Sequence, residues 1–440
     1  MADFTEFSID DGGFSRADFL KGAAALGMAV PMAGVLGTIG ADSATAADAA
    51  VLRGTLTKPP VLESLFTLSN IYYANYSAGA KQAAKDLGIK LDVNVSNSNL
   101  DSQKAAIENA PAQGNKGLFV MAESEATQPE LLRLAQQQKL PAVSNHTQAL
   151  WAATPYDIGP YYIAFHAING SKAFEATVTS AFKQLGGKGN VLYITGIKGA
   201  TPDTDRTLGF NRALKKFPGI KVLETRSGNW NRVDARPVID DLLTRHSNVD
   251  AIICSNDEET LAAVASLQEH GKKALVTGFD GVPEVLDLIK QGRAFATFAQ
   301  HPSWIGGYSV VRIFDYLNGW KPTPLERMMF FGGFVVDTPA SAGKYKQVMY
   351  GKTVPYDFKK MSRVLHPNDW DPQDALAPID LNGFWKSKAK PAGYKFPQAY
   401  SSAWAGGGAK KVAKLYASHF KSDPLAAVRK ATRTGGTIIT

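Results

Sequence analysis

Short apolar runs alternate with amphipathic stretches along the chain from residue 61 onward. The first run is Leu65-Phe66-Thr67-Leu68, and residues 74–87 then repeat apolar side chains at helical spacing until Gly88. Residues 91–95 alternate apolar and polar positions, as a half-buried strand does. Further helices are predicted at 102–112 and 128–138, and further strands at 117–121 and 141–144. This order predicts a parallel sheet wrapped by helices.

The same alternation restarts after an irregular, aromatic-rich stretch at residues 151–165. The second set predicts strands at 190–194, 221–225, 251–254, 274–277 and 294–297, and helices at 171–185, 205–217, 233–245, 260–270 and 283–291. The two sets are similar in size but show no repeat at the level of sequence. We therefore predict an α/β fold with two successive parallel-sheet lobes.

Polar and aromatic side chains follow the predicted strands. In open parallel sheets, ligands bind outside the carboxyl ends of the strands, so these positions are the candidate site. The candidates at these ends are Asn70, Tyr72, Tyr73, Asn145, His146, Trp230, Asn256, Asp280 and Gln300. Asn70 and Asn256 serve equally well as helix caps. Taken together, the amides, aromatic faces and carboxylate predict a cleft for a hydroxylated small molecule.

The first 46 residues have the features of an export signal. Ser15-Arg16-Ala17-Asp18-Phe19-Leu20-Lys21 is similar to a twin-arginine signal, although Ala17 replaces the second arginine. A weakly apolar stretch follows, and Ala44-Thr45-Ala46 is a pattern that a signal peptidase accepts. We expect export to the periplasm or cell envelope, with a linker at 47–61. A disordered cytosolic tail is the alternative interpretation.

The charge of the chain is concentrated near its end. The whole sequence of 440 residues has a net charge of +8, but residues 381–440 hold eleven basic residues and one acid, Asp423. The two-lobe body is nearly neutral, so the basic excess does not describe the ligand. We expect that deletion of 381–440 leaves ligand affinity intact. The single cysteine, Cys254, excludes a disulfide framework and a zinc site made of several thiolates.

Several strings together resemble one family. Gly278-Phe279-Asp280-Gly281-Val282-Pro283-Glu284 and Ala296-Thr297-Phe298-Ala299-Gln300-His301-Pro302 are the most specific, and Asn256-Asp257-Glu258 and Arg206-Thr207-Leu208-Gly209-Phe210 support them. Residues 62–337 resemble type I periplasmic solute-binding proteins of the ribose- and galactose-binding kind. The resemblance implies two lobes, 62–165 with 302–332 and 166–301 with 333–345, joined by a three-segment hinge near 160–168, 299–303 and 330–338. Residues 346–440 would form a basic C-terminal extension packed partly on the lobes.

The resemblance also implies roles for the candidate residues. Asn70, Tyr72 and Tyr73 fall where the family has an asparagine and two stacking aromatics, and Trp230 falls on the stacking aromatic of the second lobe. Asn256, Asp280 and Gln300 fall on groups that hold sugar hydroxyls. The implied function is the solute-binding component of an ABC importer, in which the ligand closes two lobes and the protein docks on a membrane permease.

Four positions, at three places along the chain, depart from the family pattern. His146-Thr147 replaces an Asp-Arg pair, Thr204 replaces an arginine, and Phe165 replaces a serine. The resemblance therefore implies that two guanidinium groups and a carboxylate are replaced. This predicts a ligand bulkier or more apolar than a common pentose or hexose, near Phe165, Tyr161, Tyr162 or Trp151. A shift of one residue in the alignment, with Asn145 at the carboxylate position, is the competing explanation.

Other functions find less support in the sequence. Around His146 and His301 the sequence shows no motif spacing of an acid–base pair, a nucleophile–base pair or a metal site, so we expect neither an enzyme nor a cofactor. A transcription regulator would need a DNA-binding motif where the export-like segment stands, and we expect no nucleic-acid partner. A sensory protein for a membrane receptor remains an alternative to transport. We expect a monomer with a small polar ligand.

Overall fold

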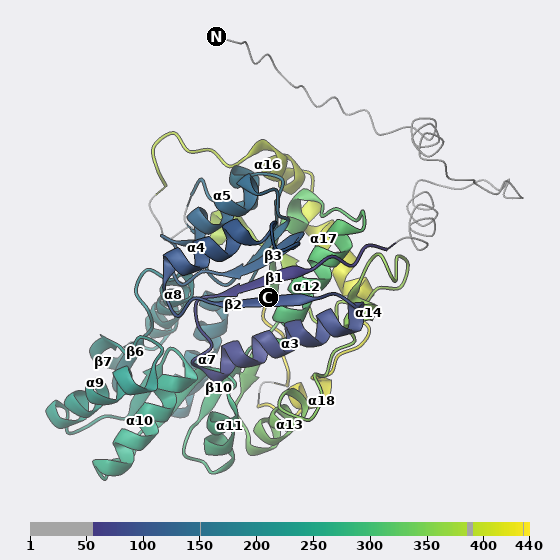
Figure 1. Ribbon diagram of the computed structural model, residues 1–440. Coiled ribbons are helices and arrows are strands. Elements are labelled where there is room, and N and C mark those ends of the chain that lie inside the picture. Colours follow the sequence, from purple (N-terminus) through teal and green to yellow (C-terminus); the bar gives the residue numbers. More distant parts are fainter. Residues whose placement is uncertain (1–55, 150, 385–389, 434) are drawn as a thin grey trace, which may run out of the picture. The chain divides into compact units, whose positions relative to one another are not determined.

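The computed structural model describes residues 56–440 apart from residues 150, 385–389 and 434 (Figure 1). The predicted export signal at 1–46 and most of the predicted linker at 47–61 lie outside these described residues. Within the described part of the chain, no helix combines the length and the apolar character that crossing a membrane requires.

The first sheet contains seven strands in the order β13-β11-β5-β4-β3-β1-β2. Neighbouring strands are parallel except for β13, which pairs antiparallel with β11. The elements that enter it first along the chain are β1 (Val61–Leu65), α3 (Ile71–Leu87), β2 (Leu91–Val95), α4 (Leu100–Asn109), β3 (Gly117–Met121), α5 (Gln128–Gln137), β4 (Ala142–Asn145), α6 (Pro155–Ile158) and β5 (Tyr162–Ile168). We call this sheet with its helices the first lobe.

The second sheet contains six strands in the order β12-β10-β9-β8-β6-β7, with β12 antiparallel to β10. Its elements before residue 300 are α7 (Gly170–Gln184), β6 (Lys188–Thr195), α8 (Thr201–Lys216), β7 (Gly219–Ser227), α9 (Arg232–Arg245), β8 (Ala251–Cys254), α10 (Asp257–Glu269), β9 (Leu275–Asp280), α11 (Pro283–Lys290) and β10 (Ala296–Ala299). This sheet with its helices is the second lobe. The predicted α/β class with two parallel-sheet lobes is confirmed.

Helix α3 illustrates how the local sequence produces these elements. The side-chain oxygen of Asn70 accepts hydrogen bonds from the backbone of Tyr72 and Tyr73, which caps the helix start. The first strand was predicted at 65–68, but its pairing with β3 ends at Leu65 because the chain then turns toward this cap. The carboxyl end of β1 and the start of α3 therefore lie together.

The chain crosses between the sheets at three places. It leaves the first sheet after β5, returns after β10 through α12 (Pro302–Leu317), and leaves again between β11 (Met328–Phe331) and β12 (Phe334–Val336). The first crossing comes slightly later than the sequence predicted, because β5 remains paired in the first sheet as far as Ile168. Short connections of this kind allow lobes to rotate about a few backbone torsions.

The C-terminal residues are part of the core. The remaining elements are η1 (Pro324–Arg327), α13 (Pro339–Met349), α14 (Phe358–Met361), β13 (Leu376–Pro378), α15 (Leu381–Phe384), α16 (Gln398–Ala405), α17 (Gly408–His419) and α18 (Ala426–Arg429). Tyr400, Tyr416 and Val428 are each at most 2% exposed, and the Tyr416 hydroxyl donates to Glu326 at 3.1 Å. Residues 381–440 are therefore no separable tail, and removing them would expose apolar surface of the first lobe.

Candidate functional site

A cavity lies between the carboxyl ends of the strands of both sheets, and its empty space, part of which is open solvent, amounts to about 480 Å³. From the first lobe it is lined by Phe66, Asn70, Tyr72, Tyr73, Met121, Ala122, Glu123, His146 and Thr147. From the second lobe and the crossing after β10 it is lined by Pro202, Arg206, Trp230, Asn256, Asp280 and Gln300. Parallel topology accounts for this convergence, because strand ends of one sheet share an edge. The lining is mixed, with aromatic faces next to amide, carboxylate and guanidinium groups.

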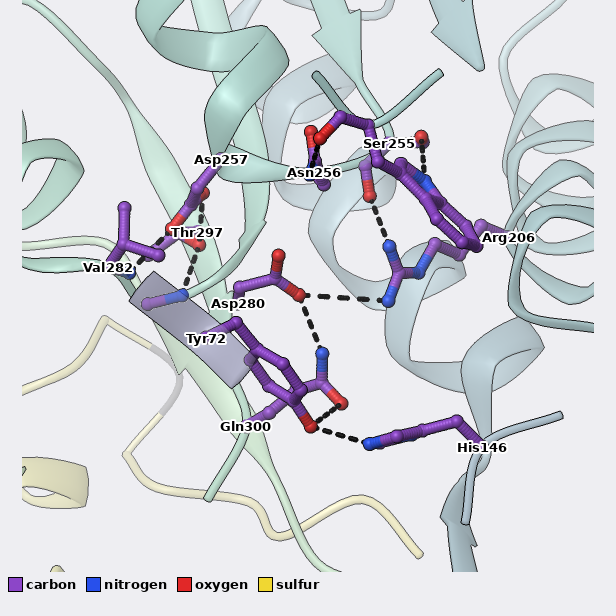
Figure 2. Close-up of polar contacts among 12 residues, drawn as sticks. Tyr72, His146, Arg206, Ser255, Asn256, Asp257, Asp280, Val282, Thr297 and Gln300 are labelled. Carbon is purple, nitrogen blue, oxygen red and sulfur yellow. Dashed lines mark hydrogen bonds and ion pairs between the residues drawn. The ribbon is translucent and has the colours of Figure 1, made fainter. Parts of the chain in front are cut away.

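Asp280 is the centre of the polar wall in the second lobe (Figure 2). Its Oδ1 accepts a hydrogen bond from Nε2 of Gln300 at 2.7 Å and lies 3.7 Å from a guanidinium nitrogen of Arg206. Burial raises the pKa of Asp280 above its ordinary range, and the Arg206 charge opposes that shift. Asp280 also has a φ of 124°, a strained value for a residue with a Cβ, so surrounding contacts hold it in place.

Arg206 is fixed from several sides. It donates to the backbone oxygen of Ser255 at 2.8 Å, and its guanidinium carbon lies 3.9 Å from the ring centroid of Phe279. It is only 7% exposed, so the charge is held inside the protein beside the carboxylate of Asp280. A buried guanidinium held in this way is ready to donate to a ligand oxygen without reorganisation.

Trp230 forms the aromatic wall of the second lobe. Its ring nitrogen donates to the Ser255 hydroxyl at 2.9 Å, and its backbone oxygen accepts from the Asn256 amide at 3.2 Å. The ring also fits closely against Gly196, where an added Cβ would lie 1.9 Å from Nε1 of Trp230. Asn256 caps α10 as well, since its side chain accepts from the backbone of Glu259. Asn256 thus positions Trp230 in addition to facing the cavity.

Tyr72 and His146 form the opposite wall. The Tyr72 hydroxyl lies 2.6 Å from Nε2 of His146 and 3.4 Å from Oε1 of Gln300 (Figure 2). Burial, with a further effect of Arg206, lowers the pKa of His146 to about 3, so its ring is neutral at physiological pH. The first lobe therefore presents a phenol and a neutral imidazole where the second lobe presents the carboxyl of Asp280 and the guanidinium of Arg206.

Three of the predicted site residues lie outside the cavity wall. Asn145 is buried behind it and accepts hydrogen bonds from Tyr76 and Ser309. Phe165 lies in the apolar core of the first lobe, because its position in β5 directs the ring into a cluster of buried side chains. Thr204 bonds the backbone oxygen of Ala200 within α8. The structure therefore places these three side chains outside the lining of the cavity.

Arg206 supplies the guanidinium group that the sequence pattern suggested was replaced in the second lobe. The sequence comparison placed the family arginine at Thr204, but Arg206, two residues later on the same helix, lines the cavity. Two residues turn a helix by about 200°, so the two side chains point in very different directions. The string Arg206-Thr207-Leu208-Gly209-Phe210 already contained the signal. Phe66 and Glu123, which also line the cavity, follow strands without a distinctive motif.

The aromatic residues expected near the ligand have other surroundings. Tyr162 bonds Ser144, Gln128 and Gln148 inside the first lobe. The ring of Trp151 packs against Tyr394 of the C-terminal extension, with centroids 5.6 Å apart. Apolar surface at the cavity comes instead from Phe66, Tyr73 and Trp230, which also line an adjoining hollow that is open to solvent.

Hydrogen bonds join the lobes beside the cavity. The hydroxyl of Thr201, at the start of α8, lies 2.7 Å from Oε1 of Glu125 and accepts from the backbone nitrogen of Gln148 at 3.1 Å. The backbone nitrogen of Glu125 also donates to the oxygen of Gly199 at 3.0 Å. Glu125 and Gln148 belong to the first lobe and Gly199 and Thr201 to the second, so these contacts form between the lobes.

Comparisons with known proteins agree with this geometry. The chain is 29% identical over 280 residues to a ribose import binding protein of Salmonella typhimurium, covering 63% of this chain and 92% of that protein. It is 28% identical over 268 residues to the D-allose-binding periplasmic protein of Escherichia coli, covering 60% and 86% respectively. A crystal structure of a twin-arginine translocation pathway signal protein from Burkholderia phytofirmans superimposes with a TM-score of 0.63 at 26% identity, covering 69% of this chain and 97% of that chain.

The family itself follows from a match over more than half of the chain. Residues 64–321 match the periplasmic binding protein domain. The family predicted from the sequence strings is thereby confirmed, and residues 322–440 extend beyond the matched region. The chain crosses three times between two sheets, and a cavity lies between their strand ends. By this match the chain belongs to the periplasmic binding protein domain family.

Proposed function

We propose that this protein captures a small hydroxylated solute, a sugar or polyol, between its two lobes and delivers it to an ABC importer in the membrane. The observation that carries this proposal is the cavity wall formed by Asp280, Arg206 and Gln300 beside the ring of Trp230. The relatives named for ribose and D-allose binding support the same ligand class.

The chemistry of the wall suits hydroxyl groups. A carboxylate accepts, a guanidinium donates and an amide does both, so neighbouring hydroxyls of one ring can be paired in full. Pairing matters because each buried polar group left without a partner costs about 1–3 kcal/mol. The indole ring supplies a flat surface for the C–H face of a sugar ring.

The side chains of the first lobe restrict the class of ligand further. Tyr72 and the neutral His146 offer hydrogen bonds without a formal charge, and Phe66 and Met121 add apolar surface. We infer a solute whose hydroxyls face the second lobe and whose opposite side is less polar or bulkier than a common pentose. Because Arg206 restores one guanidinium, this departure from an ordinary sugar site is confined to the first lobe.

We propose that the protein binds its solute without converting it chemically. Closing of the lobes would be favoured by the contacts that the solute makes with both of them at once. Among residues 56–440 outside the gaps, no group of three His, Cys, Asp or Glu side chains is arranged to hold a metal ion. The relatives named above are binding proteins, which supports the same interpretation. Residence in the periplasm follows from this role.

A thermal-shift screen followed by calorimetry tests the proposal. The panel contains D-ribose, D-allose, L-arabinose, D-galactose, xylitol and myo-inositol, with larger and deoxygenated derivatives of each. A binder at one hundred times its Kd should stabilise the fold by about 2.7 kcal/mol, and Asp280→Asn should abolish the shift. The proposal fails if no polyhydroxylated compound binds, and recovery of a chemically altered compound would indicate an enzyme. Tight binding of unmodified ribose or galactose would contradict the inference about the first lobe.

The membrane partner needs a separate test. Loss of uptake of the identified solute in a strain lacking this protein would support transport. Intact uptake with a lost behavioural or transcriptional response would instead favour a sensory role.

A further inference from the structure

The C-terminal part of the chain crosses between the lobes two further times after the three crossings described above. Helix α13 packs on α11 of the second lobe, and α14 then packs on α3 and α12 of the first lobe. Strand β13 joins the first sheet and α17 packs on it, after which α18 returns to α13. The extension is thus anchored on both lobes (Figure 1).

One part of the extension contacts the crossing that follows β10. Oδ2 of Asp374 lies 2.7 Å from Nδ1 of His301, and these residues are 3% and 4% exposed. The ring nitrogen of Trp304 donates to the backbone oxygen of Pro372 at 2.7 Å. His301 directly follows Gln300, whose amide bonds Asp280 in the cavity. The contact of Asp374 therefore lies one residue from the candidate ligand site.

The same carboxylate also touches the crossing between β11 and β12. A Cβ added at Gly332 would lie 2.6 Å from Oδ1 of Asp374 and 2.7 Å from Cγ2 of Ile438. The next residue, Gly333, exchanges two backbone hydrogen bonds with Ile439, at 3.2 and 2.8 Å. Two of the three crossings are consequently packed against the extension, and Asp374 lies between them.

The last residues of the chain also hold the second lobe. Nζ of Lys172, on α7, donates to the backbone oxygen of Thr440 at 3.3 Å. The backbone nitrogen of Arg433 donates to Asp337 at 2.9 Å, and the hydroxyl of Thr338 donates to the oxygen of Ala431 at 2.6 Å. Strand β13, which follows Asp374, is paired in the first sheet, whereas the last residues of the chain contact the second lobe. The extension therefore connects the two lobes across the crossings.

We propose that residues 372–376 and 435–440 form a hinge strap that limits how far the lobes open, with Asp374 as the residue that positions His301 and thereby Gln300. Lobe opening changes the torsions of the crossings, and contacts packed against those crossings must stretch or break. Breaking the buried pair of Asp374 and His301 would leave a polar group without its partner, which opposes wide opening. This inference goes beyond the proposed function, because it concerns the ligand-free protein.

Distances between spin labels on the two lobes measure the opening directly. Ala105 on α4 and Ser247 after α9 are exposed and lie on different lobes, and Cys254 is buried, so Ala105→Cys and Ser247→Cys give two accessible labelling sites. Pulsed electron resonance is recorded without ligand on three doubly labelled proteins: the full-length chain, the full-length chain with Asp374→Ala, and a chain that lacks residues 435–440. We expect a distance distribution that is broader and longer by several ångströms in both variants.

Two further variants make the result specific. Asp369→Ala removes an exposed carboxylate of the extension that pairs with Lys360 at the surface, and it should leave the distribution unchanged. Asp374→Asn keeps an acceptor for His301 and should restore the narrow distribution. Circular dichroism checks each fold, and the deletion variant decides alone if Asp374→Ala unfolds. Unchanged distributions in both strap variants would overturn the inference, whichever solute the protein binds.

Discussion

The hydroxyl of Tyr72 lies 2.6 Å from Nε2 of His146, and this pair forms the polar wall of the first lobe. Tyr72→Phe removes the hydroxyl while keeping the ring, so the imidazole loses its partner. We expect the affinity for the identified solute to fall about 5- to 15-fold, the value of one hydrogen bond in a buried site. Titration calorimetry measures the change. Tyr394→Phe is the matched control, since that hydroxyl donates to Asp157 at 3.1 Å outside the cavity lining, and an equal loss in both variants would contradict the assignment.

Trp230 gives a second prediction for ligand binding. Trp230→Ala removes the stacking surface, and we expect the affinity to fall more than tenfold while the thermal unfolding transition stays cooperative. Asp280→Ala should weaken binding to a similar extent. Trp230→Phe keeps an aromatic face and should retain part of the affinity. Unchanged affinity in both alanine variants would refute the assignment of the second-lobe wall.

The contacts of Thr201 predict an effect on lobe closure. Thr201→Val replaces the hydroxyl that bonds Glu125 and Gln148 with a methyl group of similar size. The closed arrangement loses hydrogen bonds between the lobes, so we expect roughly tenfold weaker binding, mainly through faster dissociation of the solute. Stopped-flow fluorescence measures that rate. Thr204→Val is the same change on the same helix, where the hydroxyl bonds only Ala200 among the described residues, and it should have little effect.

Glu63 predicts how stability depends on pH. This carboxyl is buried in β1, and burial raises its pKa to about 7, although the hydrogen bond from Ser77 and the charge of Lys81 act in the opposite direction. The folded-state pKa exceeds the unfolded-state value, so this contribution to stability is present at low pH and is lost as pH rises through 7.

Glu63→Gln removes that titration. The variant should gain stability relative to the natural protein by up to roughly 3 kcal/mol between pH 5 and pH 8. Urea unfolding at both pH values measures the difference, with the exposed Glu108→Gln as a control. A difference between variant and natural protein that does not change with pH would show that Glu63 has an ordinary pKa.

The sequence predicted the two sheets because apolar runs such as Gly117–Met121 are buried on both faces, a pattern typical of parallel strands. It did not predict β12 and β13, because strands of three residues carry too little alternation to distinguish them from loops. The contact of Asp374 with His301 joins positions 73 residues apart, and no local pattern encodes it.

The cavity was predictable where a residue lies at a strand end, as Asp280 does in β9, or directly after one, as Gln300 does after β10. It was less predictable on helix α8, where a two-residue error in placing the arginine selects Thr204 in place of Arg206. The placement of Phe165 at the cavity has the equivalent difficulty in a strand, because a shift of one residue moves a side chain to the other face of the sheet.

The place of β11 between β5 and β13 has a consequence for synthesis of the chain. All seven residues of β5 are buried in the finished protein, yet the strand that covers its free edge begins only at Met328. A nascent chain that ends before that residue exposes an apolar strand with unpaired backbone groups, which is a template for aggregation. Strands that arrive late along the chain therefore protect the early ones, and the edge of β5 stays unpaired while residues 169–327 are being made.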